Sequence, residues 1–142
     1  AVQHHARAVV ARLTPDLARD EALRRRYVRD VERVAQLVES GAWGIAPILA
    51  IGPAPDPRDP SAEPPFRVRV QPSGRSFQEW LARSPAPIDE IAQLGAALCD
   101  ALGSLHALGA VAMALRPENI WWTDDGRVVL TDLGLARVEG LS

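Results

Sequence analysis

Apolar residues recur at three- and four-residue spacing in two stretches of the chain, which predicts two helices. The first covers residues 20–38, and Asp20 and Glu21 stand at its N-terminal end, where the helix dipole favours negative charge. The second covers residues 88–108 and ends before Gly109. Alanines and glycines accompany its leucine stripe, so this helix is apolar or small nearly all round. Such a helix is expected to be buried on several sides.

Shorter apolar or alternating runs predict strands. Three of them lie in the first half of the chain, at 6–13, 45–51 and 66–70. Two more, at 120–122 and 128–130, flank a Thr-Asp-Asp-Gly-Arg sequence, which is typical of a β-hairpin turn.

Two local signals connect these elements. Residues 53–65 hold six of the twelve prolines and are expected to form an extended loop without a core of its own. Ser76 and Glu79 have the spacing of a capping box and predict a short helix that starts after Ser76. The order of elements predicts an α+β fold. It has a small antiparallel sheet with one helix, followed by a helical portion with a β-hairpin.

The most specific pattern lies near the end of the chain. Leu115, Pro117, Glu118 and Asn119 keep the frame of the sequence His-Arg-Asp-Leu-Lys-Pro-Glu-Asn, and an Asp-Leu-Gly sequence begins at Asp132, thirteen residues after Asn119. This arrangement resembles the catalytic loop and metal-binding turn of bacterial serine/threonine protein kinases. The resemblance implies a partial kinase-like fold that runs from the third strand of a kinase to the Asp-Leu-Gly turn.

The resemblance also implies a division of the chain into two parts. Residues 1–72, including the proline-rich loop, match the N-terminal lobe of a kinase. Residues 73–142 match part of the C-terminal lobe and end at the start of the activation segment. The chain begins with Ala1, so either an initiator methionine was removed or the chain is a piece of a longer polypeptide.

Several positions that carry catalysis in kinases hold other residues here. Ala114 replaces the catalytic Asp, while Ala112 and Met113 replace the preceding His and Arg. Ala11 falls where the lysine of the third strand is expected, and all 16 basic residues of the chain are arginines. The helix carboxylate that pairs with that lysine would fall near Asp30. The resemblance therefore implies a pseudokinase, not an enzyme, that acts as a scaffold or regulatory interaction domain.

Two metal-facing positions of the kinase pattern remain, Asn119 and Asp132. An alternative function follows from them, in which the chain senses Mg·ATP by binding nucleotide without transferring phosphate. The purely structural explanation is that both side chains hydrogen-bond the backbone of the loop. On that explanation the chain has no cofactor and no metal.

Two parts of the chain are candidate contact surfaces. Trp121 and Trp122 are neighbours on one strand and face opposite sides, so one is expected in the core and the other is a candidate interaction anchor. Helix 88–108 is expected to be covered by a protein partner, a second copy or the remainder of its own polypeptide.

The composition bears on which partners and which cellular compartment are expected. The net charge is −2 and hydrophobic residues make up 47% of the chain, a balance that gives no sign of nucleic-acid binding. No apolar run has the length of a membrane span. The single cysteine, Cys99, excludes an internal disulfide framework and suits a reducing compartment, so a cytoplasmic location is expected.

Overall fold

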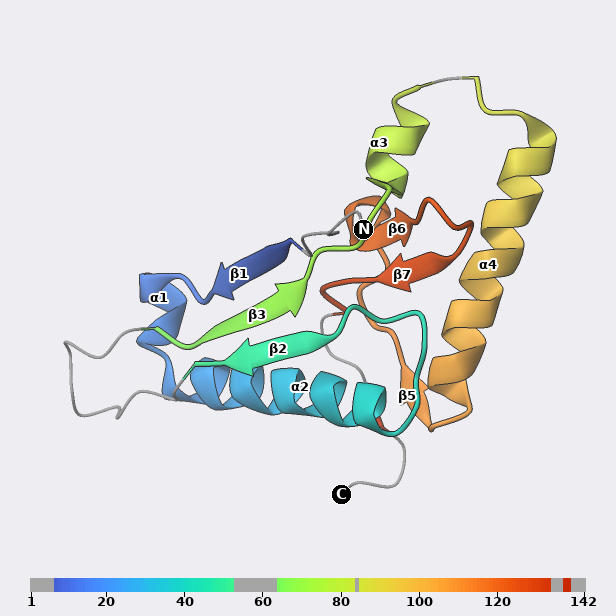
Figure 1. Cartoon of the computed structure of the whole chain (residues 1–142). Helices are drawn as coiled ribbons and strands as arrows, with labels where there is room; N and C mark the ends of the chain where they lie inside the picture. The colour runs from blue at the N-terminus through green and yellow to red at the C-terminus, as the bar shows by residue number, and fades with distance from the viewer. Residues whose placement is uncertain (1–6, 53–63, 84, 134–136, 139–142) are drawn as a thin grey trace, which may run out of the picture. The chain divides into compact units, whose positions relative to one another are not determined.

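The structure is a computed structural model that describes residues 7–52, 64–83, 85–133 and 137–138 (Figure 1). The chain forms two compact units, each described here by itself. The first unit comprises Ala1–Gln36 and Pro47–Gln71, and the second comprises Leu37–Ala46 and Pro72–Ser142. An α+β fold with small antiparallel sheets is confirmed, although most of the proline-rich loop lies outside the described residues.

The first unit is built on a three-stranded antiparallel sheet of β1 (Ala8–Arg12), β2 (Ile48–Ile51) and β3 (Phe66–Val70). Strand β3 lies in the centre, so the sheet has the order β1-β3-β2 (Figure 1). The β1–β3 pair is regular, whereas the β2–β3 register shifts between Ile48 and Ala50. All three strands were predicted, although β1 and β2 are shorter than the apolar runs that signal them.

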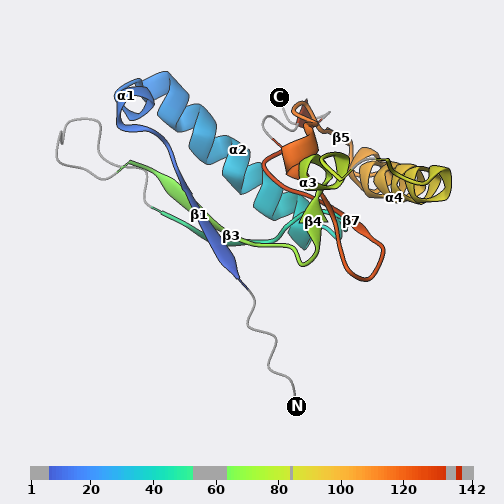
Figure 2. The ribbon, with the colours of Figure 1, turned by 90° about the horizontal axis from the view of Figure 1, so that it is seen from above.

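Helix α2 (Glu21–Glu39) runs along this sheet (Figures 1 and 2). Asp20 caps the helix, because its Oδ1 accepts hydrogen bonds from the backbone N–H groups of Ala22 and Leu23 at 2.8 and 3.1 Å. Tyr27 joins helix to sheet by donating its hydroxyl to the carbonyl of Ala11 at 3.0 Å. The one-turn helix α1 (Pro15–Ala18) before it was not predicted; its proline at the first turn has the fixed φ that a helix start needs.

The alternating residues of β3 place arginine on the face of the sheet that meets α2. Arg67 stands opposite Ala11 in the β1–β3 pair, and its guanidinium carbon lies 5.8 Å from the ring centre of Tyr27. Arg69, on the same face of β3, is only 8% exposed. On the opposite face, Val10 is 56% exposed. The aliphatic parts of these arginine side chains thus pack where apolar side chains usually do. A flat guanidinium can also stack on an aromatic ring.

The second unit combines two helices with small sheets. Its three-stranded sheet has the order β4-β6-β7, and a further pair joins β5 to β8. The short helix, the long helix and the hairpin were predicted; the two-residue strands and the 3₁₀ turn η1 were not. The elements are β4 (Arg75–Ser76), α3 (Phe77–Leu81), α4 (Ile88–His106), β5 (Ala110–Val111), η1 (Pro117–Asn119), β6 (Ile120–Trp122), β7 (Val128–Leu130) and β8 (Arg137–Val138).

The core of the second unit lies between α4 and β7. Gly44 lets the segment 37–46 approach α4 closely, because a Cβ added at Gly44 would lie 2.7 Å from the Cβ of Ala101. The N–H of Leu130 donates to the carbonyl of Gly44, and the N–H of Ala46 donates to that of Leu130, at 2.7 and 2.9 Å. Among the helices of the described residues, none combines the length and apolar character that crossing a bilayer requires.

Helix α3 begins with the capping box that the sequence predicts. The backbone N–H of Glu79 donates to Ser76 Oγ at 3.2 Å, and Glu79 Oε2 accepts from the backbone N–H of Ser76 at 2.8 Å. Hydrogen bonds from the backbone and then the side chain of Ser76 hold the pKa of Glu79 below its usual 4.5. The charged carboxylate is therefore the form that supports the cap.

We expect Glu79→Gln to lower the stability of the second unit at neutral pH and to lose this effect in acid. A carboxyl whose pKa is depressed in the folded state stabilises that state above its unfolded pKa, and the contribution disappears as pH falls through the folded pKa. Thermal unfolding followed by tryptophan fluorescence at pH 7 and at pH 3 measures the gap between the two proteins. All four tryptophans lie in the second unit. Glu118→Gln is the control, and an equal pH dependence in it would contradict the prediction.

Candidate functional site

The β6–β7 hairpin brings together the two residues that the kinase-like pattern singles out. Ile120 and Leu130 are paired at the open end of the hairpin, so Asn119 and Thr131 are next to each other just beyond it. The N–H of Thr131 donates to the carbonyl of Asn119 at 2.8 Å. The spacing of thirteen residues between Asn119 and Asp132 is therefore the length of one hairpin with its turn.

The side-chain amide of Asn119 ties two backbone segments to each other. Its Nδ2 donates to the carbonyl of Ala114 and to the carbonyl of Asp132, each at 3.3 Å. Both partners are carbonyl oxygens, which only accept, so the amide nitrogen must face them. Oδ1 consequently faces away from these two carbonyls. This geometry supplies the structural explanation offered for Asn119, and it leaves the amide oxygen with a fixed orientation.

Asp132 has an unusual backbone conformation. Its φ is +48°, and it is the one described residue other than glycine with a positive φ. Aspartate tolerates this left-handed region better than most residues. The next residue, Leu133, is 3% exposed and anchors the turn in the core. A residue held in a sparsely populated conformation by its surroundings is a reason to look for function at that position.

The donor chemistry of this pair fits a magnesium–nucleotide site in part. Mg²⁺ is bound by one or two carboxylates together with phosphate oxygens and water. Asp132 supplies a carboxylate and Asn119 an amide oxygen. The described residues contain no group of three or more His, Cys, Asp or Glu side chains that could hold a metal. The remaining ligands would therefore have to come from a nucleotide, and binding at Asn119 and Asp132 stays a prediction.

The loop before η1 contains the replaced kinase positions. Ala112 and Ala114 are partly buried, whereas Met113 is 60% exposed. A methyl group accepts no proton, so a proton acceptor for phosphoryl transfer would have to come from a residue other than Ala114. Arg116, at the position of the loop lysine, is exposed and pairs with Glu118 at 3.8 Å. That exposed pair contributes little to stability.

The other kinase-like positions belong to the first unit. Ala11 lies in β1 and is partly buried. Arg12 lies on the opposite, exposed face, and its guanidinium carbon is 6.0 Å from the ring centre of Phe66. The basic residue nearest to Ala11 across the sheet is Arg67. Sequence reasoning missed Arg67, although its alternation with the apolar residues of β3 placed it on one face. The sequence does not reveal that β3 pairs with β1, and this pairing is what brings Arg67 beside Ala11.

Asp30, the expected partner of the absent lysine, is partly buried on α2. Burial raises its pKa, while Arg26, Arg33 and Arg29 act in the opposite direction. Arg33 is the one within ion-pair distance, at 3.9 Å between Nη1 and Oδ1. The charges around Asp30 therefore come from its own helix.

The two adjacent tryptophans are both partly buried. Trp122 packs against Trp80, with ring centroids 6.1 Å apart and planes tilted by 59°. The indole nitrogen of Trp121 is buried and has no hydrogen-bond partner among the described residues. Neither indole is fully exposed, and a role as interaction anchor stays a prediction.

Comparison with known proteins supports the resemblance. No family model matches the chain. Serine/threonine-protein kinase PknK of Mycobacterium tuberculosis is 34% identical over 137 residues, which are 94% of this chain and 11% of that protein. Probable serine/threonine-protein kinase PkwA of Thermomonospora curvata is 30% identical over 130 residues, 91% of this chain and 16% of that protein. Serine/threonine-protein kinase AfsK of Streptomyces coelicolor is 30% identical over 131 residues, with corresponding shares of 92% and 15%.

The chain is thus a kinase-like segment, similar over nine-tenths of its length to one part of bacterial serine/threonine kinases. It spans between 11 and 16% of the length of these three relatives. The expectation that the protein is not an enzyme is wrong, because the proteins it matches are named as serine/threonine kinases. That expectation rested on single positions, three in the loop and the missing lysine near Ala11, whereas the similarity extends over nearly the whole chain.

We expect Asn119→Asp to lower the unfolding free energy by about 1–3 kcal/mol, the cost of leaving buried hydrogen-bonding groups unsatisfied. A carboxylate cannot donate to the carbonyls of Ala114 and Asp132 and repels them. Protonation restores a donor, so part of the loss should be recovered at pH 3. Denaturant unfolding followed by tryptophan fluorescence measures both values. Glu118→Gln, on the same turn, is expected to stay within about 0.5 kcal/mol; a similar result for Asn119→Asp would refute the bracing role.

Proposed function

We propose that this kinase-like segment is a regulatory or scaffolding interaction module within a protein related to serine/threonine kinases. The observation that carries the proposal is the exposed apolar face of α4. Only Leu94, Ala101 and Leu105 of this helix are buried. Ile88 and Ile91, in contrast, are 81% and 46% exposed. A cytoplasmic location is part of the proposal, because an exposed thiol at Cys99 suits a reducing compartment.

The exposed residues of α4 form a continuous stripe. Their spacing of four, three, four and four residues follows the helical period, so they share one side of the helix. The small residues of the stripe would let a partner backbone approach closely, and nothing in the described structure lies within 4 Å of a Cβ added at Gly95 or Gly103. The α4 stripe consists of Ile88, Ala92, Gly95, Cys99 and Gly103.

Cys99 reports directly on whether the α4 stripe is covered. In the native protein we expect its thiol to react with a maleimide at least tenfold more slowly than in an Ala92→Arg variant, whose long charged side chain disrupts the contact. Ala82→Arg makes the same exchange at an exposed residue outside α4 and should leave the rate unchanged. Mass spectrometry of the peptide that contains Cys99 gives the rates. Fast labelling in the unaltered protein would exclude a covered stripe.

A second candidate function is the binding of a magnesium–nucleotide complex. The orientation of the Asn119 amide favours it, because both amide hydrogens are used by backbone carbonyls and Oδ1 faces elsewhere. The left-handed conformation of Asp132 also supports it. The two candidate functions are compatible, since a bound nucleotide could regulate the interaction.

If nucleotide binds, Mg·ATP should raise the unfolding free energy by about 2.7 kcal/mol at a concentration 100 times its dissociation constant. Asp132→Asn should abolish this gain while tolerating the left-handed backbone. Asp100→Asn, an exposed change on α4, should retain it. Thermal unfolding with Mg·ATP, and with ATP plus a chelator, provides the comparison. A gain that persists in Asp132→Asn would assign the nucleotide to another site, and no gain in the unaltered protein would reject this function.

A further inference from the structure

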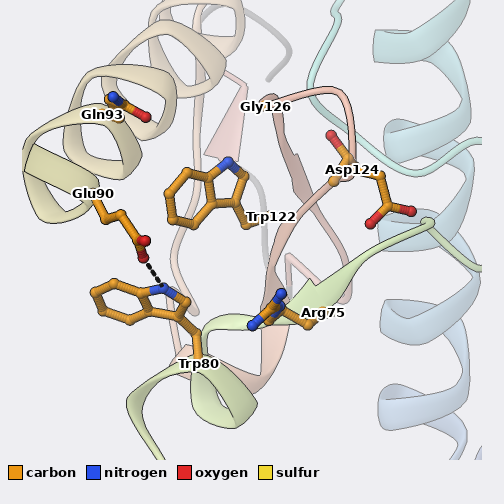
Figure 3. A pocket seen from close by; sticks show the side chains of 8 residues that line it. Arg75, Trp80, Glu90, Gln93, Trp122, Asp124 and Gly126 are labelled. Carbon is orange, nitrogen blue, oxygen red and sulfur yellow. Dashed lines mark hydrogen bonds between the residues drawn. The ribbon is translucent and has the colours of Figure 1, made fainter. Parts of the chain in front are cut away.

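A pocket of about 390 Å³ lies in the second unit between α3, the first turns of α4 and the β6–β7 hairpin (Figure 3). Two indoles form part of its wall, those of Trp80 and Trp122, whose planes are tilted by 59°. Trp80 is 7% exposed and stacks on Phe77 at a centroid distance of 5.3 Å, so its ring is held by packing on both sides. Neither Asn119 nor Asp132 lines this pocket, which is therefore separate from the kinase-like loop.

A carboxylate is fixed beside the two indoles. Glu90, in the first turn of α4, accepts a hydrogen bond at Oε2 from the indole N–H of Trp80 at 3.2 Å (Figure 3). This bond places the carboxylate at the edge of the Trp80 indole, beside two aromatic rings whose faces carry partial negative charge. The lining holds Glu90 and Asp124 as anions and Arg75 as a cation, so two negative charges less one positive charge leave one negative charge in excess. The combination favours a cationic ligand over an anionic one.

The shapes of these groups distinguish among cations. A guanidinium is planar, stacks on an indole face and donates two parallel hydrogen bonds to one carboxylate. An ammonium is a more strongly hydrated point charge and has no plane to stack. The two tilted indoles, with the Glu90 carboxylate beside them, therefore suit a guanidinium better than an ammonium. The elements around the pocket also carry exposed Leu81 and Ile88, which offer apolar contacts to residues that flank an arginine in a peptide.

We propose that this pocket binds an arginine side chain of a protein partner, stacked on Trp122 and paired with Glu90. The site adds a specific recognition element to the apolar contact of the α4 stripe. None of the stripe residues lines the pocket, and only Ile88 belongs both to the stripe and to the apolar contacts beside the pocket. Arg75 adds a positive charge to the lining of the pocket, which weakens the binding of a second cation.

The probe is the tripeptide Ala-Arg-Ala with both ends blocked, titrated into the intact protein. The indole N–H resonances of Trp80 and Trp122, followed by NMR, should shift and saturate. The same tripeptide with citrulline in place of arginine keeps the shape and loses the charge, and it should bind at least tenfold more weakly. A lysine tripeptide should bind with an intermediate affinity. Equal shifts with the arginine and citrulline peptides, or no saturation with the arginine peptide, would overturn the proposal.

Three variants locate the binding. Glu90→Gln keeps an oxygen that can accept from Trp80 and removes the charge, so the arginine peptide should bind at least fivefold more weakly. Asp89→Asn removes the same charge from the neighbouring, exposed residue, which does not line the pocket, and should leave the affinity unchanged. Arg75→Gln removes the competing cation and should tighten binding. Equal losses in Glu90→Gln and Asp89→Asn would show non-specific charge attraction and refute the site, as would weaker binding in Arg75→Gln.

Discussion

The kinase-like loop depends on a single side-chain amide. Two backbone carbonyls, those of Ala114 and Asp132, accept hydrogen bonds from Asn119, and the hairpin between Asn119 and Asp132 fixes where the Asp132 carbonyl lies. If the amide were lost, two partly buried carbonyls would lack a donor, and such groups are costly to leave unsatisfied. Asn119 therefore links the conformation of the loop to the hairpin.

Much of this arrangement is visible in the sequence. The turn residues between 120–122 and 128–130 predict the hairpin, and the hairpin explains the distance between Asn119 and Asp132. The capping box of α3 is equally local, because both of its residues lie within one turn. Long periodic segments such as α2 and α4 are also predicted correctly, since many positions contribute to one signal.

Other parts depend on contacts between distant segments, which a single sequence does not reveal. Strands β4, β5 and β8 have two residues each, too few to show a period. The arginines of β3 read as a polar face, and only the pairing with β1 shows Arg67 turned toward Tyr27 of α2. The residues that line the pocket are likewise spread between positions 75 and 126, so no local motif predicts it.

The loop can keep its frame with alanine at position 114. The bond from Asn119 ends on the backbone carbonyl of Ala114, which every residue type possesses, so the side chain at 114 is not needed for the fold. At position 119 the side chain itself donates both bonds, and no backbone group can replace it. The residue that the fold of this loop requires is thus not the residue at the position of the catalytic aspartate. The side chain of Asn119 is fixed by the fold, whereas the side chain at 114 can change without altering the architecture that the chain shares with serine/threonine kinases.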